Sequence, residues 1–90
     1  MGIRIEFFGV ARQRTGTASV VVPVAGAVTL GVLLARLAEQ FPNWAAECLE
    51  GDRIRPSYII NVDGHRFVHD PRELIGDNAS LLIMSADAGG

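Results

Sequence analysis

The sequence of 90 residues contains no lysine. Its eight basic residues are all arginine and stand against ten Asp and Glu residues, which gives a formal net charge of −2. Proteins that bind nucleic acid by neutralising phosphates carry an excess of basic residues. The slight acidic excess of this chain therefore argues against a nucleic-acid partner.

Cysteine is almost absent as well. Cys48 is the one cysteine, so a disulfide cannot form within the chain and a reducing compartment is expected. The sequence has no apolar run near the roughly 20 residues of a membrane span, and its N-terminus alternates charged and apolar residues, unlike a signal peptide. These absences predict a cytoplasmic protein. The apolar neighbours of Cys48 predict a buried structural thiol rather than a reactive one.

The composition that remains is that of one globular domain. Apolar residues make up 49% of the chain and charged residues 20%, which is the balance of a folded protein rather than a disordered one. A chain of this length can hold a single hydrophobic core. We therefore expect one domain.

Two strands are predicted at the N-terminus. Residues 3–8 alternate apolar and polar side chains, with Ile3, Ile5 and Phe7 on one face and Phe8 on the polar side. Residues 17–23 are rich in β-branched side chains, as strands are. Residues 9–16 read as a polar loop between them, because a glycine stands at each end. A connection this short predicts an antiparallel hairpin.

The next segment has helical spacing. Thr29 is a good N-cap, and apolar residues follow at the intervals of one helix face, namely Leu30, Leu33, Leu34, Leu37 and Phe41. Pro42 ends this helix, and residues 44–49 suggest a second, shorter one. Gly31, inside the main helix, costs about 1 kcal/mol relative to alanine.

The second half of the chain predicts further strands. Residues 58–62 and 66–68 form a hairpin around the turn signal Asp63-Gly64, and Leu74 and Ile75 make an apolar turn under the sheet. Residues 80–84 are almost continuously apolar, as in a central strand covered on both faces. The fold class is thus α+β, with the main helix packed on one face of a sheet.

Residues 85–90 are small and end in Gly89-Gly90. Such a segment cannot anchor itself in a core, so we predict a domain of residues 1–84 and a flexible tail of about 20 Å at full extension.

Several of these segments together resemble a known family. They are the first strand with its loop (IEFFGVARQRTG), the leucine-rich helix, the Asn61-Val62-Asp63-Gly64 hairpin, the Gly76-Asp77 turn before the last strand and the terminal Gly-Gly. The chain resembles the MoaD/ThiS family of ubiquitin-like sulfur carriers over its whole length. Within the family it is more similar to MoaD, the small subunit of molybdopterin synthase, than to the shorter ThiS. It departs from many relatives by having Met84-Ser85-Ala86 where they carry proline before the tail.

The resemblance implies a β-grasp fold of about five strands, with the first and last strands central and parallel. It also implies a chemistry in which an E1-like enzyme (MoeB/ThiF-like) uses ATP to adenylate the terminal carboxylate. A sulfur donor then forms a thiocarboxylate, and the sulfur passes to an acceptor such as a MoaE-like synthase subunit. Other branches serve thiamin, cysteine or secondary-metabolite synthesis. The carrier itself binds no permanent cofactor or metal.

The same resemblance identifies candidate site residues. Gly90 would carry the adenylate and then the thiocarboxylate, and Gly89 would let the tail thread a narrow channel, because glycine has no Cβ. The terminal carboxyl is ionised at neutral pH and can attack a phosphate. Phe8, Met84, Asp87 and Ala88 are the candidates for partner binding, although Phe8 and Met84 could instead be core residues.

Two other functions stay open. A protein modifier would use the same activation but join Gly90 to lysines of target proteins; without lysine of its own, it could extend a chain only through the Met1 amine. A non-conjugating binding module would make no use of Gly89 and Gly90. His65 and His69 are four residues apart but flank a predicted strand, which does not favour a metal site. Arg12 and Arg14 belong to the predicted loop and are expected to be solvated.

Overall fold

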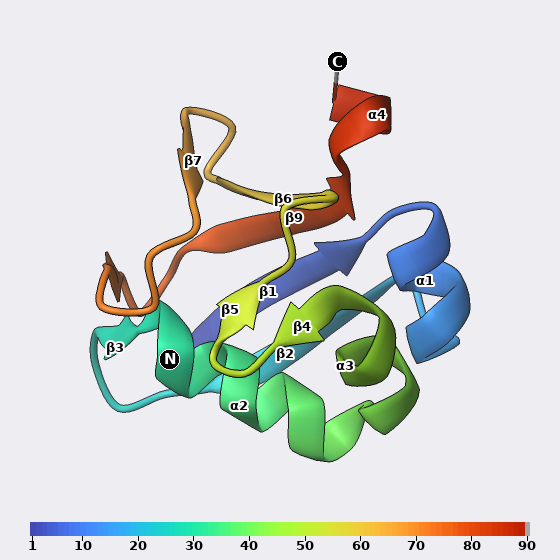
Figure 1. Cartoon of the computed structure of the whole chain (residues 1–90). Helices are drawn as coiled ribbons and strands as arrows, with labels where there is room; N and C mark the ends of the chain where they lie inside the picture. The colour runs from blue at the N-terminus through green and yellow to red at the C-terminus, as the bar shows by residue number, and fades with distance from the viewer. Residues whose placement is uncertain (90) are drawn as a thin grey trace.

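The computed structural model describes residues 1–89, and Gly90 lies outside the described part of the chain. The central feature is a five-stranded mixed sheet in the order β2-β1-β9-β6-β7. Figure 1 shows α2 and α3 on one side of this sheet. The five strands are β1 (Gly2–Phe7), β2 (Ser19–Pro23), β6 (Tyr58–Val62), β7 (Arg66–Val68) and β9 (Ser80–Ser85).

The pairing of the strands confirms the predicted topology. β1 and β2 form the antiparallel hairpin, with Ile3 opposite Val22. β1 and β9 are parallel neighbours in the middle of the sheet, with Phe7 opposite Ile83. The alternating residues Ile3, Ile5 and Phe7 are all buried. The chain therefore has the β-grasp arrangement that the family resemblance implies.

The connection between β1 and β2 differs from the prediction. Instead of a loop, residues Val10–Thr15 form helix α1. Gly9 and Gly16 flank it with φ angles of 63° and 75°, a left-handed region that favours glycine. Ala11 is the only residue of α1 that is buried, so the segment has no apolar periodicity by which a helix could be recognised.

The main helix α2 (Leu30–Gln40) forms as predicted. The Thr29 hydroxyl accepts a hydrogen bond from the Val32 amide at 3.3 Å, and the four leucines of the stripe are buried. Phe41 ends the helix and packs edge-on against Phe7, with ring centroids 5.6 Å apart. Pro42 then occupies the start of α3 (Pro42–Cys48), which begins two residues earlier than predicted, because proline suits the first turn of a helix.

Four strands of two residues each were not indicated by the sequence. β3 (Val28–Thr29) pairs with β8 (Leu74–Ile75), and β4 (Leu49–Glu50) pairs with β5 (Arg53–Ile54). The prediction that both Leu74 and Ile75 lie under the sheet is wrong for Leu74. Ile75 is fully buried, whereas Leu74 is 63% exposed, because neighbouring residues of a strand point to opposite faces.

The expectation that β9 is covered on both faces is also wrong. Leu81 and Ile83 are buried on the side of the helices, whereas Leu82 and Met84 are only half-buried. The sheet thus has one face under α2 and α3 and one open face. On this open face, the apolar side chains of Leu82 and Met84 are accessible to a partner.

The last strand extends one residue beyond the predicted limit of the domain. The boundary placed after residue 84 falls inside β9, which includes Ser85, and residues Ala86–Gly89 form the single helical turn α4. The flexibility of residues 85–90 stays a prediction. None of the helices within residues 1–89 has the length and apolar character needed to cross a membrane.

Candidate functional site

The candidate site is the end of the central strands from which the C-terminal residues leave. Met84 and Ser85 of β9 lie opposite Ile59 and Tyr58 of β6. The Ala86 amide then donates a hydrogen bond to the Ser57 carbonyl oxygen at 2.8 Å. Backbone pairing with β6 therefore holds the chain up to residue 86, at the base of α4. Asp87 is exposed on α4.

Part of the predicted site cannot be placed. Gly90, the predicted point of attachment, lies outside the described residues. The backbone of Ala88 and Gly89 belongs to α4, but the side chain of Ala88 also lies outside what the structure describes. The roles predicted for Ala88, Gly89 and Gly90 therefore stay predictions.

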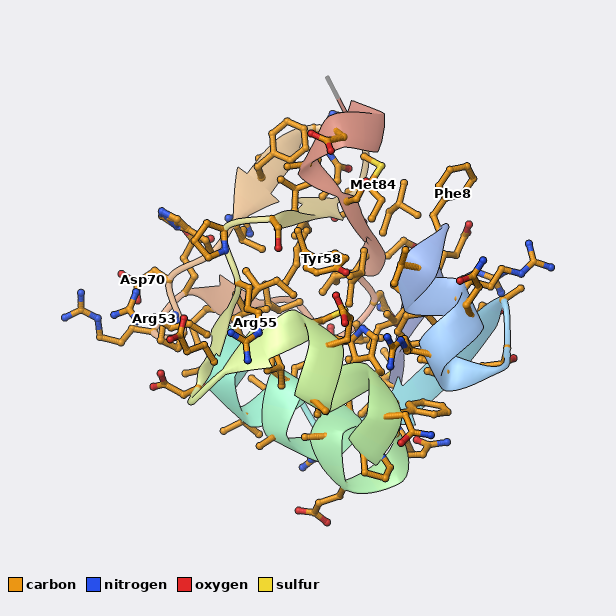
Figure 2. All side chains as sticks on the ribbon, turned by 45° about the vertical axis from the view of Figure 1, so that its right-hand side comes forward. Phe8, Arg53, Arg55, Tyr58, Asp70 and Met84 are labelled. Atoms are coloured by element: carbon orange, nitrogen blue, oxygen red, sulfur yellow. The ribbon has the colours of Figure 1, made fainter. Side chains whose placement is uncertain are left out.

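Phe8 lies on the surface beside this end of β9. Its amide donates a hydrogen bond to the Ile83 carbonyl oxygen at 3.0 Å, and 55% of the residue is exposed. Phe8 is therefore not a core residue. Met84 is half-buried, and Figure 2 shows it below α4, with the Phe8 ring projecting away from the body of the molecule.

Three further apolar residues that the sequence analysis did not single out share the open face. In β6 and β7 the buried residues Ile60 and Val68 point toward the helices, so Ile59 and Phe67 point the other way. Leu82 does the same in β9. We call Phe8, Ile59, Phe67, Leu82 and Met84 the open-face patch. Alternation within residues 58–62 and 80–84 is the signal that could have revealed Ile59 and Leu82.

The polarity of the open face changes along the strands. Arg4 and Glu6 precede Phe8 on the same side of β1 and form an exposed ion pair at 3.4 Å. The apolar residues of β1 and β9 on this face are thus concentrated toward the end where the C-terminal residues leave. A partner that receives these residues would meet an apolar surface next to them.

A polar network joins the elements behind this end of the sheet. The Tyr58 hydroxyl donates a hydrogen bond to Glu47 Oε2 at 2.6 Å, and Arg14 Nη2 donates to Glu47 Oε1 at 3.3 Å. The hydrogen bond to Glu47, together with burial, raises the pKa of Tyr58 well above its ordinary value. The network connects α1, α3 and β6. Arg14 is exposed, as predicted, and also forms an ion pair with Glu47.

Cys48 is buried beside this network, as its apolar neighbours predict. Burial and the nearby Glu47 carboxylate raise the pKa of the thiol from 9.0 to about 11. Because a thiolate is the reactive form of cysteine, Cys48 is not suited to act as a nucleophile near neutral pH.

Within residues 1–89, no three side chains of His, Cys, Asp or Glu come together as a potential metal site. The geometry instead places an apolar patch beside the exit of the C-terminal residues.

No family model matches the chain, and no curated protein matches it either. Several solved structures share its fold. The crystal structure of SAMP1 from Haloferax volcanii has a TM-score of 0.82 and 19% sequence identity, with full coverage of both chains. The small archaeal modifier protein 1 of Methanosarcina acetivorans has a TM-score of 0.74 and 19% identity, covering 99% of this chain and 96% of its own.

A third similar structure comes from Pyrococcus furiosus and is assigned as molybdopterin converting factor, subunit 1. It has a TM-score of 0.75 and 16% identity, with 94% of this chain and 97% of that chain covered. The resemblance to MoaD/ThiS-like proteins is thereby confirmed at the level of the fold, which is ubiquitin-like.

Proposed function

We propose that the protein is a ubiquitin-like sulfur carrier that works through the carboxylate of Gly90. The observation that carries the proposal is the parallel pairing of β1 and β9. It puts the start of the C-terminal segment and the exposed ring of Phe8 at the same end of the sheet. The fold of the similar structures supports the proposal, and the function further requires that Gly90 be the native C-terminus.

The proposed chemistry has two steps, and each is catalysed by a partner. In the first, a carboxylate oxygen of Gly90 attacks the α-phosphorus of ATP, and pyrophosphate leaves. In the second, hydrosulfide attacks the carbonyl carbon of the acyl adenylate, and AMP leaves with the electron pair of the broken C–O bond. The thioacid that forms loses its proton to give a thiocarboxylate. The adenylate is needed because a free carboxylate is a poor electrophile.

The role of this chain is to deliver the C-terminus. Gly89 and Gly90 have no Cβ and can enter a narrow channel in any backbone conformation. The open-face patch would supply the selectivity that such a featureless segment lacks, since exposed apolar patches mark protein interaction sites. Asp87 and Ala88 would contact the partner near the channel entrance.

For the pathway, we propose molybdopterin synthesis. The similarity to a structure assigned as a molybdopterin converting factor subunit supports this choice, as does the resemblance of the first strand and its loop to MoaD. The partners would then be a MoeB/ThiF-like activating enzyme and a MoaE-like acceptor subunit, in the cytoplasm. Sulfur transfer to thiamin, cysteine or secondary-metabolite precursors is the alternative within the same chemistry.

A second candidate is a protein modifier. The similar structures from Haloferax volcanii and Methanosarcina acetivorans are small archaeal modifier proteins, and a modifier would share the adenylation step. The two functions differ in the product. A modifier leaves an isopeptide bond between Gly90 and a target lysine, whereas a carrier returns with its carboxylate after giving up the sulfur.

An adenylation assay tests the docking part of the proposal. Phe8→Ala should slow pyrophosphate exchange by the activating enzyme about tenfold, as expected when one exposed aromatic anchor is lost. Val21→Ala is the matched control, because Val21 is 61% exposed but lies in β2 at the edge of the sheet. Equal exchange rates for the two variants would contradict a docking role for Phe8.

A further inference from the structure

A cavity of about 570 Å³ opens where β5, β6 and β7 meet. Cavities of about 300–1,000 Å³ are the size that binds small molecules or a few side chains. Arg53, Arg55, Tyr58 and Phe67 are among the residues that line it. Figure 2 shows Arg53 and Arg55 on the side of Tyr58 that faces away from Phe8. Ile59 and Phe67 line the cavity and also belong to the open-face patch, so the cavity adjoins this patch on the side away from Phe8.

The apolar lining combines a buried part and an exposed part. Ile54, Tyr58 and Val68 are buried, whereas Phe67 is 62% exposed. A largely exposed phenylalanine next to buried apolar side chains offers a surface on which an apolar group can pack, and aromatic groups gain additional energy there from edge-to-face contacts. The lining thus favours a ligand with an apolar, preferably aromatic, part.

The polar residues of the cavity favour an anion. The backbone of Arg53 pairs with Glu50 of β4, but its guanidinium forms no hydrogen bond or ion pair with any residue in the described part of the chain. Arg55 has only Glu50, at 4.0 Å, in an exposed pair of the kind that contributes little. Two arginines against one carboxylate give this site a local charge of +1, in a molecule whose net charge is −2.

The neighbouring acid Asp70 does not change this balance. Its carboxylate accepts two hydrogen bonds from the Arg72 guanidinium, at 3.1 and 3.3 Å, and one from the Arg72 amide at 2.9 Å. Asp70 is therefore hydrogen-bonded to Arg72. Its pKa is lowered mainly by these hydrogen bonds and to a smaller extent by the charge of Arg53, whose hydrogen-bond donors remain available for a ligand. A guanidinium binds a carboxylate through two parallel hydrogen bonds, so the natural ligand group for Arg53 and Arg55 is a carboxylate.

The position of the cavity favours a protein segment as its occupant. Pro56 and Tyr58 line it and flank Ser57, which holds the base of α4 through its carbonyl oxygen. β7 is the last strand of the sheet, so an extended segment can lie along its free edge and place every second side chain against the cavity. A partner that binds the C-terminal residues could thus also contact the cavity.

From these observations we infer that the cavity binds an extended segment of a partner protein, one that presents an aromatic side chain between acidic residues. The choice of a protein as the occupant rests on the proposed carrier function, in which the C-terminus is passed to partner proteins. The preference for an aromatic anion rests on the cavity itself.

The test is an NMR titration of the isotope-labelled full chain with the peptide acetyl-Asp-Glu-Phe-Glu-Asp-amide. The amide signals of Arg53, Ile54 and residues 67–69 should shift on binding. Arg53→Gln and Phe67→Ala should each weaken binding at least about tenfold, the loss expected for one charge-assisted hydrogen bond or one aromatic anchor. Both residues are exposed, so the fold should survive. Arg12→Gln, an exposed arginine on α1, should leave binding unchanged.

Two further probes identify the occupant. The uncharged peptide acetyl-Asn-Gln-Phe-Gln-Asn-amide should bind at least about tenfold more weakly, because it cannot pair with the arginines. Phenylacetate is a small molecule that combines an aromatic ring with a carboxylate. It should bind more weakly than the acidic peptide. Equal binding of the two peptides, shifts confined to the surroundings of Phe8, or tighter binding of phenylacetate than of the peptide would each overturn the inference. The titration needs neither ATP nor an activating enzyme, so its outcome is independent of the sulfur chemistry.

Discussion

At the scale of single residues, the buried thiol of Cys48 makes a clear prediction. A fully buried cysteine with a pKa of about 11 reacts only when the protein opens. At pH 8 a disulfide reagent should therefore label the native protein at least about a hundredfold more slowly than the urea-unfolded protein. Equal labelling rates would contradict the burial of Cys48.

The same thiol makes the stability depend on pH in the alkaline range. The pKa of Cys48 is 9.0 in the unfolded chain and about 11 in the folded protein. Between these values the unfolded state releases the proton while the folded state keeps it, so the free energy of unfolding falls as pH rises. The contribution is constant below pH 9. Unfolding in urea at a series of pH values should show this decline, and Cys48→Ala should reduce it.

The hydrogen bond from Tyr58 to Glu47 is the strongest single contact of the polar network. Its O···O distance is 2.6 Å and its acceptor is a carboxylate, for which a contribution of about 1.5–3 kcal/mol is typical. Tyr58→Phe should lower the free energy of unfolding by about this amount in urea denaturation. Arg14→Gln removes only an exposed ion pair and should cost less than about 1 kcal/mol. Equal losses for both variants would show that the network is not centred on Tyr58.

At the scale of elements, the N-cap of α2 is open to a direct test. Thr29→Ala removes the acceptor for the Val32 amide and should cost about 1 kcal/mol of stability. Thr29→Ser keeps a hydroxyl in place and should restore most of the loss. Urea denaturation of the two variants measures the difference. Equal stabilities of the alanine and serine variants would mean that the cap contributes nothing.

The turn between β6 and β7 depends on its glycine. Asp63 and Gly64 both have positive φ angles, 55° and 74°, as a type I′ turn requires. Gly64→Ala should cost about 1–2 kcal/mol, because a Cβ disfavours this backbone region. Gly76→Ala is the matched control: Gly76 has no positive φ and has open space around its Cβ position, so its replacement should be close to neutral. Similar losses at both positions would contradict the turn geometry.

The elements also show what the sequence could and could not predict. The leucine stripe after Thr29 and the alternation of Ile3, Ile5 and Phe7 are periodic signals, and both elements form as expected. Helix α1 was not predicted because Ala11 is its only buried residue, so the segment has the residue pattern of a polar loop. The open face of β9 was not predicted, for a different reason. A continuous apolar run does not reveal that Leu82 and Met84 lack a covering layer, which only the positions of α2 and α3 decide.

At the scale of the whole molecule, the fold gathers its interaction features around one end of the sheet. The parallel β1 and β9 bring Phe8 beside Met84, and β6 holds the base of α4 and borders the cavity. The C-terminal segment thus leaves beside the open-face patch, and the cavity with its two arginines adjoins this patch at Ile59 and Phe67. Terminal Gly-Gly and the resemblance to a family pointed to this end of the chain, but the cavity was not foreseeable, because it is built from β5, β6 and β7 together.

Intact-protein mass spectrometry is the measurement that tests the central claim most directly. The full chain would be incubated with ATP, an E1-like activating enzyme from the same cell and a sulfide source. The account predicts a mass increase equal to one oxygen replaced by one sulfur, located at Gly90 and absent when Gly90 is deleted, while the deletion variant keeps its melting temperature. An unchanged mass, with an enzyme shown to be active on another carrier, would contradict the account.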